Sequence, residues 1–232
     1  MIPPGVLRER FRAISYIRRQ QKLLDRFNSP AETRKPEFKE FYAENRVKYT
    51  LGKYIKPHVF CSWDKFDPEK VKPVKNPLRW PYNKPQGGVW ASPYTPEEKY
   101  CSPWIKFCCE NDEDEWIQNC YLVFPEDNAK IAVIDSLKDY ERLLAHYGHI
   151  IRTPKGRALR VLDFEKLAKD FDGLWVTEDG LAECSNNFLL EHRYGITSLW
   201  GWDLESIIWF KPKFKEVTSL DKIPHKCKAK CE

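Results

Sequence analysis

Apolar residues recur at helical spacing at the start of the chain. Between residues 6 and 27 they fall mostly three or four positions apart, so they share one side of a predicted helix. These positions are Leu7, Phe11, Ile14, Ile17, Leu24 and Phe27. The Asn-Ser-Pro sequence at residues 28–30 ends this helix. Pro36 is predicted to open a second short helix, with apolar positions at Phe38, Phe41 and Tyr42.

Short runs rich in aromatic and β-branched residues replace this pattern after about residue 49. The predicted strands span residues 54–63, 120–124, 130–134, 174–177 and 204–210. The predicted helices span residues 97–110, 136–147 and 162–171, the second of them capped by Ser136. Because the elements follow one another without a regular strand–helix–strand spacing, we expect an α+β fold. The expected organisation is a helical extension over 1–48 and one domain over 49–232.

Aromatic content indicates a packed core or an aromatic groove, since the chain has nine Trp and thirteen Phe. No apolar run approaches the roughly 20 residues that a membrane span requires. The first residues also lack the apolar stretch of a secretory signal. We therefore expect no membrane partner and a cytoplasmic location, either in the producing cell or in a target cell.

The positive charge of the chain is concentrated near its beginning. The whole chain carries a net charge of +5, and the segment from Arg8 to Arg26 alone holds seven basic and two acidic residues. Such a helix usually packs its apolar face on the core and leaves its arginines in water. It also suits contact with a nucleic acid or an acidic protein surface, so the helix over 6–27 is the expected contact for a macromolecular partner.

Eight cysteines leave the redox state open, although the length of the chain favours free thiols over a disulfide scaffold. Near the end of the chain, His225, Cys227 and Cys231 have ligand chemistry. No second ligand pair with zinc-finger spacing accompanies them, so no metal site is predicted.

The common phosphate-binding and nucleophile motifs are absent: there is no P-loop, GxGxxG after a strand, GxSxG or HExxH. Three other segments combine polar and aromatic residues at predicted strands. They are HVFCS at 58–62, GGVWAS at 87–92 with Tyr100 eight residues later, and ESIIW at 205–209.

In this order the three segments resemble ADP-ribosyltransferases of the diphtheria-toxin and poly-ADP-ribose polymerase class. In that family a His begins the first core strand, a glycine-led strand carries an aromatic residue, a second Tyr follows, and a Glu begins a late strand. The resemblance implies a split β-sheet core and NAD as the substrate. The chain has Val59 after the His, where the family usually has Gly, and Trp90 at the position of the usual Tyr.

The resemblance implies that Glu205 is the catalytic residue, because a carboxylate beside the nicotinamide ribose stabilises the positive charge that develops when nicotinamide leaves. It implies that Trp90 and Tyr100 sandwich the nicotinamide and that His58 hydrogen-bonds the adenosine ribose. The residues implied in NAD binding are His58, Ser62, Trp90, Ser92, Tyr100 and Asp203. The reaction predicted in this way is transfer of ADP-ribose to a protein, DNA or RNA acceptor, with NAD glycohydrolase activity as a close neighbour.

Other interpretations remain open for the same residues. Trp90 and His58 are equally well explained as core side chains, and the glycine pair before Trp90 as a turn into a strand. The segments at 84–93 and 200–209 also resemble an uncharacterised group of phage and bacterial proteins, over roughly residues 54–215, with no known activity.

Two further functions fit the pattern. A non-catalytic module would use the basic helix and the aromatic residues to bind unpaired bases. A metal-dependent nuclease or other hydrolase would use Asp203 and Glu205, which alternate along a predicted strand and so would share one face.

Overall fold

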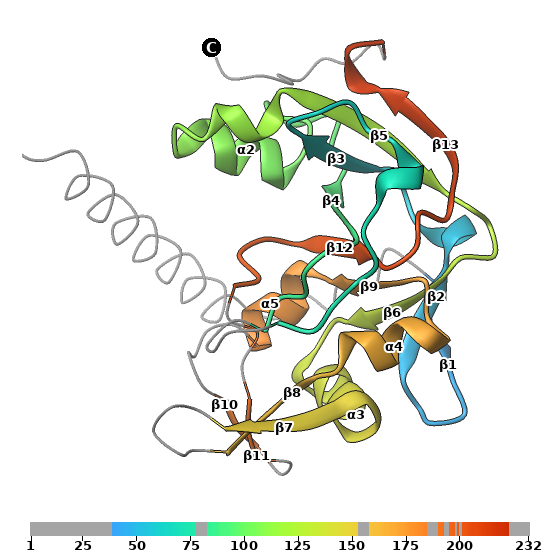
Figure 1. Ribbon diagram of the computed structural model, residues 1–232, viewed down its shortest axis with the longest axis vertical. Helices are drawn as coiled ribbons and strands as arrows, with labels where there is room; N and C mark the ends of the chain where they lie inside the picture. The colour runs from blue at the N-terminus through green and yellow to red at the C-terminus, as the bar shows by residue number, and fades with distance from the viewer. Residues whose placement is uncertain are drawn as a thin grey trace, which may run out of the picture. The chain divides into compact units, whose positions relative to one another are not determined.

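The computed structural model describes residues 39–77, 83–152, 158–184, 190–192, 195–197, 199 and 201–222. The chain divides into two compact units, residues 1–37 and 38–232, and every described residue belongs to the second. The described part is mixed α+β, with a large curled β-sheet, a smaller sheet and four α-helices (Figure 1). The helix predicted over 6–27 lies outside the described residues, as do His225, Cys227 and Cys231.

The large sheet has nine strands in the order β1-β2-β6-β9-β12-β4-β3-β5-β13. Their bounds, in that order, are β1 (Phe41–Tyr42), β2 (Lys48–Leu51), β6 (Lys130–Ile134), β9 (Gly173–Val176), β12 (Ser206–Trp209), β4 (Val89–Pro93), β3 (His58–Ser62), β5 (Asn119–Pro125) and β13 (Phe214–Ser219). Only β6 and β9 pair in parallel among these described strands. A four-stranded sheet follows the order β10-β11-β8-β7. Its strands are β10 (Leu190–His192), β11 (Gly195–Thr197), β8 (Ala158–Leu162) and β7 (Gly148–Arg152).

The helices cover different parts of the large sheet (Figure 1). They are α2 (Pro103–Glu110), α3 (Leu137–Tyr147), α4 (Phe164–Asp170) and α5 (Glu178–Cys184). Ile105 and Cys108 of α2 pack with residues of β3 and β5, whereas the buried residues of α3, α4 and α5 pack with β6, β9 and β12. Short 3-10 turns complete the described structure at Gly52–Tyr54, Pro68–Lys70, Asp114–Ile117 and Leu220–Lys222. None of the described helices has the length and apolarity of a membrane-spanning segment.

The predicted strands and helices after residue 49 are confirmed, although several of their bounds differ from the predicted ones. The predicted cap Ser136 precedes α3, and its hydroxyl accepts a hydrogen bond from the backbone N–H of Asp139. The helix predicted from Pro36 is wrong at Phe41 and Tyr42, because these residues form β1 and pair with β2. The sheet therefore begins before the predicted domain start at residue 49. The edge strand β13 was not predicted, because its sequence, FKEVTS, shows no clear alternation of apolar and polar residues. Several of its residues are exposed in the structure.

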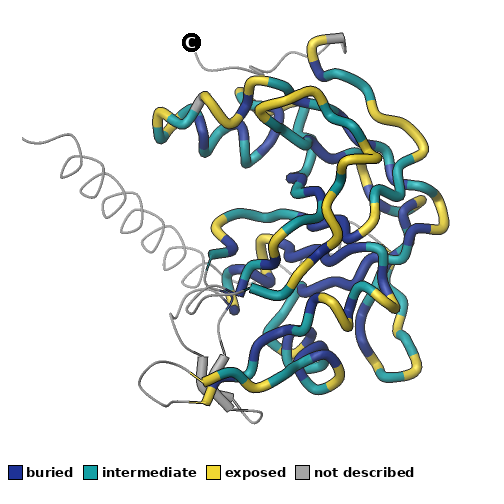
Figure 2. Tube along the Cα trace, in the orientation of Figure 1, coloured by how far each residue is buried: buried dark blue, intermediate teal, exposed yellow. Residues whose placement is uncertain are grey.

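Central strands of the large sheet are buried on both faces, as the dark tube in Figure 2 shows. One face carries Trp175, Ile207 and Ala91, which oppose one another across β9, β12 and β4. The other face carries Trp90 and Ile208, which also form a cross-strand pair. Because successive side chains of a strand alternate between faces, these two sets point in opposite directions.

Cysteine chemistry departs in part from the expectation of free thiols. Cys101 and Cys109 each take part in a disulfide bond. The free cysteines of the described part are Cys61, Cys108, Cys120 and Cys184. Spacing along the chain does not show which sulfur atoms meet, so only the tertiary structure separates the two groups.

Candidate functional site

The three segments singled out in the sequence lie on neighbouring strands, with β4 between β3 and β12. Ala91 of β4 opposes both Phe60 of β3 and Ile207 of β12. His58 opposes Pro93 at the end of β4. Continuing the register of β12 by two residues brings Glu205 level with Pro93, so His58 and Glu205 belong to the same end and the same face of the sheet.

Trp175, on β9, contacts both of these residues. Its indole Nε1–H donates a hydrogen bond to Glu205 Oε1 at 3.0 Å. The His58 ring meets the indole ring edge-on, with 5.7 Å between ring centroids. Trp175 is only 8% exposed and Glu205 is half-buried. We call the group of His58, Trp175 and Glu205 the Trp175 junction.

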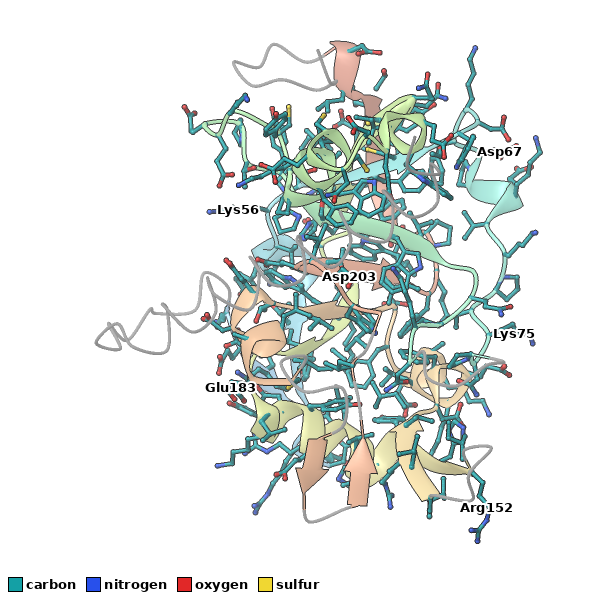
Figure 3. All side chains as sticks on the ribbon, turned by 90° about the vertical axis from the view of Figure 1, so that its left-hand side faces the viewer. Lys56, Asp67, Lys75, Arg152, Glu183 and Asp203 are labelled. Carbon is teal, nitrogen blue, oxygen red and sulfur yellow. The ribbon has the colours of Figure 1, made fainter. Side chains whose placement is uncertain are left out.

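His58 is a neutral histidine with one unused nitrogen. Its Nδ1 lies 2.8 Å from the carbonyl oxygen of Lys56, which can only accept, so Nδ1 carries the proton. Nε2 is therefore an acceptor, and it is buried without a hydrogen-bond partner. Burial lowers the pKa of His58 to about 4, although the backbone contact with Lys56 opposes this shift. The Lys56 side chain itself points away from the body of the protein (Figure 3).

Trp90 and Ser92 occupy the face opposite the Trp175 junction. The indole ring of Trp90 packs on Trp202, with 4.8 Å between centroids, and Lys84 Nζ lies 4.4 Å from the Trp90 ring centroid. Ser92 opposes Val59 and is 2% exposed, and its hydroxyl has no hydrogen-bond partner. The structure therefore does not bring Trp90 together with His58 and Glu205, because Trp90 and Ser92 point to the other face of the sheet.

The glycine pair before Trp90 has a structural explanation. Gly87 and Gly88 have φ angles of 72° and 67°, a conformation that favours glycine. A Cβ at Gly88 would lie 2.7 Å from the backbone oxygen of Trp209. The pair therefore forms the turn into β4 and permits a close approach to β12.

Asp203 belongs to the Trp90 side rather than to the Trp175 junction. It is exposed, and its charge acts on Lys84. Burial lowers the pKa of Lys84, and the Asp203 carboxylate partly offsets that shift. Asp203 and Glu205 precede β12 instead of alternating along it, so the predicted strand does not align them. Among the described residues, no group of three His, Cys, Asp or Glu has a geometry that could hold a metal.

Ser62 and Tyr100 lie apart from the junction. Ser62 ends β3, at the opposite end of the strand from His58, and its hydroxyl donates to the backbone oxygen of Asp64. Tyr100 lies beside α2 and lines an open depression of about 360 Å³ with Glu98 and Lys106. Neither residue contributes to the grouping of His58 and Glu205.

Sequence reasoning missed Trp175. It lies in the predicted strand over 174–177, but alternation indicates only that a strand forms and not which distant side chain it meets. Trp175 and Glu205 are 30 residues apart, and the antiparallel pairing of β9 with β12 brings them together.

Comparisons with protein-family models, with curated proteins and with solved structures find no match for this chain.

Proposed function

We propose that this chain transfers ADP-ribose from NAD to a macromolecular acceptor, with release of nicotinamide and with Glu205 as the catalytic carboxylate. The observation that carries the proposal is the Trp175 junction. An indole N–H holds the carboxylate of Glu205 on the same sheet face as a neutral His58 with an unused acceptor nitrogen. These two residues are also the ones that the resemblance to ADP-ribosyltransferases singles out first and last along the chain.

Glu205 has the chemistry that cleavage of the nicotinamide–ribose bond requires. As the bond lengthens, positive charge develops on the ribose ring, and a carboxylate already oriented beside it stabilises that charge without reorganisation. The hydrogen bond from Trp175 restricts the orientation of the carboxylate before the substrate binds.

His58 is suited to accept a hydrogen bond from a ribose hydroxyl. Its Nδ1 proton is committed to Lys56, so Nε2 has a lone pair available. Because burial keeps the ring neutral near pH 7, the acceptor is present under physiological conditions. An unpaired buried acceptor costs free energy. Because His58 is 1% exposed, a ribose hydroxyl reaches Nε2 only when the side chains around it move, and the new hydrogen bond would then recover that cost.

Support also comes from the neighbouring positions of β3, β4 and β12, which carry the three resembling segments and favour an ADP-ribosyltransferase-like core. Within this proposal Trp175, instead of Trp90, is the aromatic ring beside the carboxylate. The roles of Ser62, Trp90, Ser92, Tyr100 and Asp203 in NAD binding remain predictions. The acceptor is expected to contact the basic segment over 6–27.

The test is release of nicotinamide from NAD by the full chain, with and without DNA, RNA and cell lysate. We expect Glu205→Gln to lower release by roughly 100- to 1,000-fold, since the neutral amide cannot stabilise the cationic centre. Glu216→Gln, which changes an exposed carboxylate on β13, serves as the matched control and should keep full activity. Label transfer from NAD in the same reactions identifies the acceptor.

Equal release by Glu205→Gln and the unchanged chain would contradict the role of Glu205. No release in any mixture, together with no NAD binding by calorimetry, would contradict the proposal as a whole. Salt-sensitive oligonucleotide binding would then support the non-catalytic module. Hydrolysis of a nucleic acid or another substrate that a chelator abolishes would support the metal-dependent nuclease or hydrolase.

A further inference from the structure

Two free cysteines face each other across β3 and β5. Cys61 opposes Cys120 in the register of these antiparallel strands. The two thiols are in hydrogen-bond contact, and Cys120 also donates to the backbone oxygen of Ile117 at 3.5 Å. The pair lies at the end of β3 opposite His58, so it is separate from the Trp175 junction.

Backbone hydrogen bonding shows what kind of pair this is. The N–H of Tyr94 donates to the carbonyl of Pro57 at 3.1 Å, so the backbone groups of Pro57 point toward β4. Because these groups alternate along a strand, those of Cys61 also point toward β4 and away from β5. Cys61 and Cys120 therefore form a non-hydrogen-bonded pair in the β3–β5 ladder, with Cα atoms about 4.5 Å apart. That separation lies within the range of roughly 4.4–6.8 Å that a disulfide spans.

Burial, together with the hydrogen bond to Cys120, raises the pKa of the Cys61 thiol, so its thiolate is scarce at neutral pH and we expect the exchange to be slow. Cys61 is half-buried, and Cys120 is 9% exposed. Cys108 of α2 also acts on Cys61 electrostatically, but it is fully buried and lies on a helix instead of opposite in the sheet. Of these two cysteines, only Cys120 lies directly opposite Cys61 in the sheet, so Cys120 is the expected disulfide partner of Cys61.

We propose that Cys61 and Cys120 form a redox-active pair that closes to a disulfide by exchange with a small-molecule disulfide. One thiolate attacks a sulfur of glutathione disulfide, which releases one glutathione thiolate and leaves a mixed disulfide. The second cysteine, on losing its proton, attacks the protein sulfur and releases the other glutathione. Two protein thiols are oxidised and one glutathione disulfide is reduced to two glutathione thiols. Excess glutathione reverses both steps.

Closure is expected to stabilise the fold, because it links β3 to β5 across a long stretch of sequence and restricts the unfolded chain. For a protein of this size we expect the midpoint of thermal unfolding to rise by roughly 5–15 °C. The effect does not depend on the proposed transfer reaction, so it can be measured whether or not the protein cleaves NAD.

The test equilibrates the full chain with graded mixtures of oxidised and reduced glutathione, blocks the remaining thiols and maps the peptides by mass spectrometry. We expect a peptide linked through Cys61 and Cys120, lighter by two hydrogen atoms than the two reduced peptides, whose abundance follows the glutathione ratio. Cys61→Ser should lose the link and the rise in the unfolding midpoint. Cys108→Ser, the matched control at the neighbouring thiol, should keep both.

Three results would overturn the proposal: a link between Cys61 and Cys108, glutathione that stays on Cys61 without an internal link, or alkylation of both cysteines at every ratio. If Cys61→Ser does not fold, the peptide map of the unchanged chain still decides, because it names the linked residues directly.

Discussion

Two tryptophans on opposite faces of the central strands show how differently one sheet can use the same side chain. Trp175 donates its indole N–H to the carboxylate of Glu205 and touches the ring of His58. Trp90 instead packs on Trp202 and lies under the ammonium group of Lys84. Both rings bring a charged side chain against the core.

The two regions differ in the polar groups that remain available. On the Trp90 side, the Trp202 indole donates to the backbone oxygen of Asn83 at 2.7 Å, and the Lys84 ammonium lies over the Trp90 ring. In the Trp175 junction, Nε2 of His58 is buried without a partner. The Trp90 side also holds an unpaired buried group, the Ser92 hydroxyl, so an unpaired atom alone does not distinguish the two faces. The difference is that the unpaired nitrogen of His58 lies in one group with an oriented carboxylate, whereas the Ser92 hydroxyl does not.

The largest expected effect separates the two tryptophans by catalysis. Trp175→Phe keeps a ring but removes the donor to Glu205, so we expect kcat for nicotinamide release to fall roughly 10- to 100-fold, the value of a hydrogen bond to a charged group. Trp90 itself donates no hydrogen bond to Glu205, so we expect Trp90→Phe to change kcat less than Trp175→Phe does.

Steady-state kinetics with NAD measures both variants, with KM for NAD reported alongside kcat. A higher KM for NAD with an unchanged kcat in Trp175→Phe would indicate that the ring stacks on the substrate and does not orient the carboxylate. A larger loss of kcat in Trp90→Phe than in Trp175→Phe would break the comparison.

The next effect is the pH dependence of stability that His58 confers. Its pKa falls from 6.5 to about 4 on folding, so between these values the unfolded chain binds a proton that the folded chain excludes. Stability is therefore retained above this window and lost as pH decreases through it. We expect His58 to account for a loss of about 2 kcal/mol between pH 7 and pH 5.

Urea unfolding at the two pH values measures this loss, and His58→Gln, which cannot take up the proton, should lack it. An unchanged pH dependence in His58→Gln would show that the imidazole is reached by water and is not buried as a neutral acceptor.

The smallest expected effect tests whether the Trp90 side is only packing. Burial of the Lys84 ammonium group costs free energy, and the attraction of the Asp203 carboxylate offsets part of that cost. Replacing the lysine in Lys84→Met removes both contributions, so the free energy of unfolding should change by no more than about 1 kcal/mol. As a contrast, Lys48 forms ion pairs with Glu40, Asp135 and Asp139. We expect Lys48→Met to cost about 3–5 kcal/mol, because it removes the closest cation from the buried carboxylate of Asp139 and from the partly exposed carboxylates of Glu40 and Asp135.

Chemical denaturation of the two Met variants provides the measurement. Loss of nicotinamide release in a folded Lys84→Met variant would show that the Trp90 face also serves the reaction and would remove the distinction between the two regions.

Much of the fold followed from local patterns, and the exceptions have local causes. The strands at 120–124 and 130–134 and the capped helix after Ser136 were predictable, because burial and capping leave a signature within a few residues. Phe41 and Tyr42 were misassigned, since a two-residue strand is decided by its pairing with β2 and not by its own sequence. The edge strand β13 escaped for a related reason, as its exposed face requires no apolar alternation.

The candidate site was predictable only in part. The resemblance to ADP-ribosyltransferases singled out His58 and Glu205, and the structure places both on one face of the large sheet in contact with Trp175. Trp175 was not predictable, because its role depends on a hydrogen bond to a residue on another strand. Asp203 was expected to share a face with Glu205, but the two residues precede β12 and meet different partners.

By itself, the amino-acid sequence of this protein determined the α+β class, most of its strands and helices, and the residue types available for chemistry. These properties depend on side-chain periodicity and capping, which act over a few residues. Only the tertiary structure decided which face of the sheet each residue occupies and which side chains meet. Strand register makes that choice, since a shift of one residue would move Trp175 away from Glu205 and bring Trp90 to its side.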